Sequence, residues 1–110
     1  MRFQKIASIK EVGMDAKRKI SIGDLTILLV NIDGTFHAID NKCPHMGGSL
    51  YEGEIEGSKI VCPRHKTTFD VTTGKVVGPG KLAFFKVHPG PVRVYPVKIE
   101  GDDILIGIDS

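Results

Sequence analysis

Short stretches in which apolar and polar residues alternate make up much of the chain, and turn-forming residues separate them. The clearest case is residues 25–32, which are mostly apolar and are followed by Asp33-Gly34 and a second apolar stretch at 35–39. An Asp-Gly pair between two such stretches predicts a β-hairpin with a two-residue turn. No long stripe of apolar residues at helical spacing is present. The pattern therefore predicts antiparallel β-structure.

The same reasoning predicts further short strands in the second half of the chain, at 59–61, 69–71, 75–77, 92–100 and 103–108. Pro-Gly combinations at 78–80 and 89–91 predict loops, and the apolar segment 81–87 between them is expected to be a core strand or strap. The predicted fold class is all-β, with several small antiparallel sheets and with residues 41–77 inserted as a subdomain between the flanking strands.

Length and charge narrow the range of functions. A chain of 110 residues can bury one hydrophobic core and not two, so we expect a single domain over residues 1–110. A net charge of +2, with lysines and arginines spread along the chain, argues against a nucleic-acid-binding surface. No apolar run approaches the ~18 residues of a membrane helix. Residues 1–8 lack the apolar stretch of a secretion signal, which favours the cytoplasm.

Two short segments carry the candidate chemistry, Cys43-x-His45 and Cys62-x-x-His65. They contain both cysteines of the chain, so none is left for a structural disulfide. Two sulfur and two nitrogen donors suit zinc or an iron–sulfur centre. Zinc fingers usually collect their cysteines in one place and their histidines in another. One cysteine and one histidine in each loop instead favours a two-metal centre in which one iron takes the sulfurs and the other the nitrogens.

The stretches 41–50 and 62–70 resemble the two cluster-binding loops of Rieske-type ferredoxins, and the resemblance covers about residues 20–108. It implies the Rieske iron–sulfur fold and one [2Fe–2S] cluster, in which a histidine pair replaces a cysteine pair on one iron. With this family as the guide, residues 41–77 would be the cluster-binding subdomain.

The resemblance also assigns the four ligands. Cys43 and Cys62 would bind the inner iron, and His45 and His65 would bind the outer iron near the protein surface. No residue of the chain is expected to be catalytic in its own right, because the family implies an electron carrier and not an enzyme.

Five neighbours of the ligands are expected to shape the cluster's surroundings. Pro63 fixes its φ near roughly −65° and stiffens the second loop. Gly47 and Gly48 allow backbone N–H groups to turn toward the sulfurs. Thr67 matches a hydroxyl that donates to the cluster in respiratory members, and for it a sulfur hydrogen bond and simple loop polarity both stay open. Phe69 matches a tyrosine there, lacks the hydroxyl, and is expected mainly to fill the core beneath the cluster.

The high-potential respiratory members also carry two further cysteines that link their loops by a disulfide. The matching positions here are Gly48 and Arg64, so that bridge cannot form. With fewer donors to sulfur, the reduced cluster is less stabilised. We therefore expect a potential in the lower half of the Rieske range, which is roughly −150 to +300 mV.

The function implied by the resemblance is one-electron transfer. Small Rieske ferredoxins accept electrons from a flavoprotein reductase that oxidises NAD(P)H and deliver them to a terminal oxygenase or similar enzyme. A carrier that exchanges partners is expected to be a monomer, with no nucleic-acid or membrane partner.

Two alternatives remain open. One is the small Rieske subunit of a stable complex, as in some nitrite reductases, and the other is a zinc-stabilised interaction domain that uses the same four ligands. The remaining histidines, His37 and His88, lie in no motif. We expect His37 on the solvent side of its strand and assign neither residue a role.

Overall fold

The computed structural model describes residues 1–13, 16–43, 48–63, 66–78, 80–82, 85–87 and 90–108, with backbone alone for 80–82 and 85–87. The strands described are β1 (Arg2–Ser8), β2 (Lys17–Ile22), β3 (Leu25–Ile32), β4 (Thr35–Asp40), β5 (Glu54–Glu56), β6 (Lys59–Val61), β7 (Thr68–Asp70), β8 (Val76–Gly78), β9 (Gly80–Leu82), β10 (Phe85–Val87), β11 (Val94–Tyr95), β12 (Val97–Glu100) and β13 (Asp103–Ile108). Two short 3₁₀ helices accompany them, η1 (Ile9–Glu11) and η2 (Leu50–Glu52). No helix in this described part of the chain is long and apolar enough to span a membrane.

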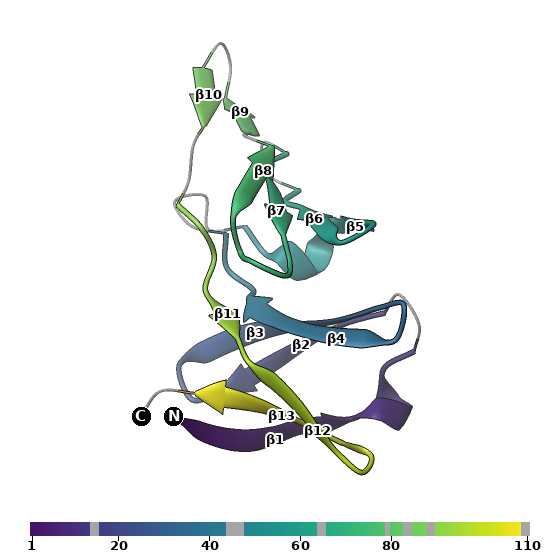
Figure 1. Cartoon of the computed structure of the whole chain (residues 1–110). Helices are drawn as coiled ribbons and strands as arrows, with labels where there is room; N and C mark the ends of the chain where they lie inside the picture. The colour runs from purple at the N-terminus through teal and green to yellow at the C-terminus, as the bar shows by residue number, and fades with distance from the viewer. Residues whose placement is uncertain are drawn as a thin grey trace.

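The lower part of the molecule, here called the base, contains two antiparallel sheets (Figure 1). One has the strand order β11-β4-β3-β2 and the other β1-β13-β12. The turn between β3 and β4 is the predicted Asp33-Gly34 pair, whose φ angles of 51° and 88° match a two-residue hairpin turn that needs positive φ at both positions. Strand β1 pairs along its length with β13, which brings the two ends of the described chain together.

The upper part, here called the head, is the chain between β4 and β11 (Figure 1). It holds η2, a sheet of order β5-β6-β7-β8, and a separate two-stranded sheet of β9 and β10. Each strand of the head is three residues long. The head is therefore built from very short ladders, in contrast to the six- to eight-residue strands that dominate the base.

Strand β3 is buried on both faces and joins two hydrophobic clusters. Ile27 and Leu29 pack within the base, against side chains such as Ile104. Leu28 and Val30 point the other way, into a second cluster shared with the head. Because successive side chains of a strand point to opposite faces, this one strand connects the base core to the core that underlies the head.

Several predicted elements are confirmed and three need correction. The hairpin at 25–39, the strands at 59–61 and 103–108, and the pairing of residues near 69 and 76 are present. The single strand predicted for 92–100 is two strands in different sheets, interrupted at Pro96, which has no N–H to continue a ladder. The core strand or strap predicted for 81–87 is also wrong, together with the loop predicted before it at 78–80. Gly78 ends β8, Gly80 begins β9, and β9 pairs with β10.

The third correction concerns His37. Side chains alternate along β4, and Ile39, two residues on, belongs to the cluster shared with the head. His37 shares that face and is partly buried, so the predicted placement on the solvent side is wrong. Burial lowers the pKa of its imidazole, and the nearby charge of Asp70 in the head opposes this shift only in part.

Candidate metal centre

The two cysteine loops close in the same way. The Cys43 N–H donates to the carbonyl of Gly48 at 2.8 Å, and the Cys62 N–H donates to the carbonyl of Thr67 at 2.7 Å. In both loops the acceptor lies five residues after the cysteine, since 48 − 43 and 67 − 62 both equal 5. The two loops, each with one cysteine and one histidine in the sequence, therefore also share a backbone feature. Each cysteine begins its loop, and its own N–H closes the loop through a hydrogen bond to the carbonyl at the other end.

The first loop has a second closure outside the first. Lys42 and Ser49 form an isolated antiparallel bridge. Next to it, the side chain of Asn41 donates to Ser49 Oγ at 2.9 Å and accepts from the Tyr51 N–H at 2.8 Å. The Asn41 carbonyl also accepts from the Leu50 N–H at 2.8 Å. Asn41 thus holds together the two ends of the segment that carries Cys43.

Both cysteines are fully buried in one apolar cluster. Cys43 and Cys62 are 0% exposed, and Phe69, also 0% exposed, belongs to the same cluster. Phe69 therefore has the buried core position expected of it. Neither cysteine forms a disulfide. Two buried thiols from separate loops, within one cluster, form a sulfur-rich floor on which a metal centre can be held.

Thr67 supplies an independent sign of a missing partner. Its side chain is fully buried, and its hydroxyl oxygen has no hydrogen-bond partner within the described part of the chain. Leaving a buried hydroxyl unpaired is costly, so such a group usually indicates an acceptor supplied from elsewhere. A thiolate or sulfide of a bound cluster is an acceptor of the required kind, so the residues present fit an iron–sulfur group.

Three further residues of the two loops lie within the described part of the chain. Pro63, next to Cys62, is exposed, and Lys66 has a φ of 61°, in the left-handed region. Gly48, at the end of the first loop, is buried. The predicted ligands His45 and His65, with Gly47, lie outside the described residues.

A tyrosine–aspartate pair anchors the end of β4 where the first loop begins. The hydroxyl of Tyr95 donates to the carboxylate of Asp40 at 2.5 Å, and the Asp40 N–H donates to the carbonyl of Arg93 at 2.9 Å. Burial, the hydrogen bond to Asp40 and the charge of Asp40 together raise the pKa of Tyr95 to about 12. The pair ties β11 of the base to the residue before Asn41.

Sequence reasoning gave no role to the side chain of Asn41 or to Asp40. A short polar residue two positions before a candidate ligand cysteine is a weak signal, because asparagine is common in turns of every kind. The partners of both residues lie far along the chain or across a loop, and only the folded structure brings them together.

Known proteins resemble this chain over nearly its whole length. Residues 2–96 match the Rieske [2Fe-2S] domain. The chain is 35% identical to the biphenyl dioxygenase ferredoxin subunit of Pseudomonas sp. (strain KKS102), over 96% of this chain and 92% of that protein. It is 32% identical to the ferredoxin component of biphenyl 2,3-dioxygenase from Rhodococcus jostii (strain RHA1), over 100% and 96%. Among solved structures, the ferredoxin of carbazole 1,9a-dioxygenase from Nocardioides aromaticivorans IC177 superposes with a TM-score of 0.83 at 25% identity, covering 99% of this chain and 100% of that one.

Proposed function

Because this chain belongs to the Rieske [2Fe–2S] family, we propose that it is a one-electron carrier that delivers electrons to a terminal oxygenase or a similar enzyme. The observation that carries the proposal is the extent of the match: the chain aligns with nearly all of a protein that is itself a dioxygenase ferredoxin subunit. Its cofactor is one [2Fe–2S] cluster, which accepts and releases a single electron when bound.

The ligands in this proposal are Cys43 and Cys62 for one iron and His45 and His65 for the other. The burial of both cysteines and the matched closure of their loops support the sulfur half of the set. The unpaired hydroxyl of Thr67 supports a donor role toward the cluster. Gly47, Gly48 and Pro63 would shape the two loops around it.

On this reading the chain's residues hold and tune the cluster and perform no catalysis of their own. The electron donor would be a flavoprotein reductase that oxidises NAD(P)H, and the carrier would act as a monomeric, single-domain protein that contacts each partner in turn. A cytoplasmic setting is part of the proposal, since two cysteines committed to metal and not to a disulfide suit a reducing compartment.

The potential would lie in the lower half of the Rieske range. Phe69 supplies no hydroxyl at a position where a donor would stabilise the reduced cluster, and the chain has no cysteine pair to link the loops. Thr67 is then a fully buried hydroxyl that is still available as a donor, because no described residue pairs with it.

The decisive experiment is electron paramagnetic resonance of the purified protein after reduction with dithionite, together with iron and zinc analysis. We expect two irons per chain and a rhombic signal whose average g is clearly below that of all-cysteine [2Fe–2S] proteins. His65→Cys serves as a matched ligand variant and should lose that signal or move it toward the all-cysteine type. Zinc without a signal would overturn the proposal in favour of a structural metal domain.

A further inference from the structure

A lysine of the base reaches across to the head at a point that no ligand motif includes. Lys17 begins β2 and pairs with Val30 of β3, so its backbone is part of the base. Its ammonium nitrogen Nζ donates to the carbonyl of Tyr51 at 2.7 Å and to the carbonyl of Gly53. It also lies 5.5 Å from the centre of the Tyr51 ring. Both acceptors belong to η2 and the residue after it, which are in the head.

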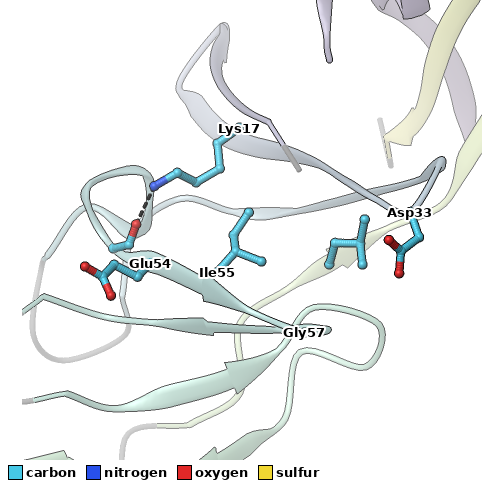
Figure 2. A pocket seen from close by; sticks show the side chains of 7 residues that line it. Lys17, Asp33, Glu54, Ile55 and Gly57 are labelled. Carbon is cyan, nitrogen blue, oxygen red and sulfur yellow. Dashed lines mark hydrogen bonds between the residues drawn. The ribbon is translucent and has the colours of Figure 1, made fainter. Parts of the chain in front are cut away.

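A groove between base and head lies beside Lys17 and Gly53. The groove has a volume of about 610 Å³ and is lined by Lys17 and Ile32 of the base and by Gly53 and Ile55 of the head. Figure 2 shows the Lys17 side chain at one end of this groove, with its ammonium hydrogen-bonded to the head, while Ile55 points into the groove. An ammonium with three donors can satisfy two carbonyls at once and still face water with the third.

The segment that Lys17 holds lies directly against the strand that leads to Cys62. Gly53 packs so closely on Val61 that a methyl group added to Gly53 would collide with the Val61 carbonyl oxygen. Glu54, the next residue, pairs with Val61 in the β5–β6 ladder. Val61 immediately precedes Cys62. A movement of Gly53 would therefore move Val61 and with it the start of the second cysteine loop.

We propose that Lys17 is a positioning residue for the cluster site: by binding the carbonyls of Tyr51 and Gly53 it fixes η2 on the base, and so holds the strand that presents Cys62. The effect on the cluster rests on the proposed function. The attachment of η2 to the base by Lys17, here called the tether, does not. Hydrogen bonds from a charged donor are stronger than neutral ones, and their loss leaves two carbonyls to be satisfied by water. Three-residue strands have few bonds of their own with which to resist that loss.

The chain offers a matched control for the test. Lys19 lies two residues along the same strand, is exposed, and places its ammonium 5.7 Å from the same Tyr51 ring. Lys17→Met and Lys19→Met therefore remove the same charge from the same face of β2 beside the same aromatic ring. They differ in the hydrogen bonds to the two carbonyls.

The measurement is hydrogen–deuterium exchange of the purified protein, followed by mass spectrometry, on peptides covering residues 50–62 and, as an internal reference, 103–108. We expect Lys17→Met to exchange about tenfold faster than Lys19→Met over 50–62, with the reference peptide unchanged in both. Lys17→Arg, which keeps the charge and the donors, should exchange at a rate nearer to Lys19→Met. In the same samples, an excess of iron chelator should bleach the visible absorbance several-fold faster in Lys17→Met.

The outcomes separate the two proposals. Equal exchange of residues 50–62 in the two methionine variants would overturn the role of Lys17, even if the wild-type signal shows an intact Rieske cluster. A wild-type protein without that signal would overturn the proposed function, and the exchange rates would still decide whether Lys17 is the tether. Faster exchange of both peptides in Lys17→Met would also count against the proposal, because it would mean general destabilisation.

Discussion

The base and the head of this molecule are held together in different ways. The base has strands of up to eight residues and its own apolar cluster, with Ile104, Ile106 and Leu29 fully buried. The head has three-residue strands, and its buried side chains share their apolar cluster with Leu28, Val30 and Ile39 of the base. Polar contacts also fix its loops: those of Asn41 on the first loop, of Lys17 on η2, and of the two cysteine amides that close the loops. The base therefore depends mainly on burial of apolar surface, while the head depends in addition on particular polar contacts and on the metal it binds.

Removal of iron should give the largest difference between base and head. Metal binding supplies folding free energy where the ligands come from separate loops, so the apo protein should keep its base and lose much of the head. Exchange of amides in β5–β7 should rise by at least about a hundredfold on removal of iron by acid and chelator, while amides in β1 and β13 change by a few-fold at most. An equal rise in both regions would show that base and head form one cooperative unit.

Asn41 offers a smaller and more local test. Replacing it by alanine removes two hydrogen bonds and leaves the partly buried Tyr51 N–H without its acceptor, which should cost about 1–3 kcal/mol in unfolding free energy. The cluster should also be lost to a chelator faster than in the wild type, because the segment bearing Cys43 is no longer pinned. Urea titration and chelator bleaching give the two values.

The matched control for Asn41 is Ser49→Ala. It removes one of the two groups that bind the Asn41 side chain, the Ser49 hydroxyl, and leaves the Tyr51 N–H bonded to Asn41. Its cost should be clearly smaller, at about 1 kcal/mol or less. If Ser49→Ala proves as damaging as Asn41→Ala, the bond to Tyr51 is not what holds the loop.

These residues also mark how far the sequence alone reaches. The 25–39 hairpin is predictable because its turn chemistry and apolar runs are local, and the cysteine–histidine spacing identifies the family from a few residues. The contacts of Asn41 and Lys17 are not predictable in this way, because their partners are backbone groups 10 and 36 residues away. The break at Pro96 illustrates a middle case: the missing N–H is visible in the sequence, yet only the structure shows that the chain changes sheets there.

The hydrogen bond from Tyr95 to Asp40, which lies in the base where the head begins, can be tested by changing the pH. Its folded pKa of about 12 lies above the ordinary value near 10, so the folded state holds the proton more tightly. The stabilisation is complete below about pH 10, falls as the unfolded chain loses its tyrosine proton, and is gone once pH rises through about 12. Tyr95→Phe has no such proton to lose.

The expected result is a difference in unfolding free energy between wild type and Tyr95→Phe that shrinks by about 1–2 kcal/mol from pH 9 to pH 12. Comparison of the two proteins at each pH cancels the titration of the lysines, which both contain. A difference that stays constant over this range would mean that the bond from Tyr95 to Asp40 does not distinguish the folded from the unfolded state.

The smallest expected effect lies within the head, at the cluster itself. Phe69 is fully buried in β7 among the same side chains as Cys43 and Cys62. Phe69→Tyr adds a hydroxyl that can donate to a cluster sulfur and favour the reduced, more negative state, which should raise the potential by roughly 30–60 mV, given that ~59 mV is a tenfold change for one electron. Phe69→Leu changes the packing without adding a donor, and it should leave the potential nearly unchanged. The two potentials, measured by redox titration of the visible spectrum, decide the point: equal shifts in both variants would show that packing around Phe69, and not the missing hydroxyl, sets the potential.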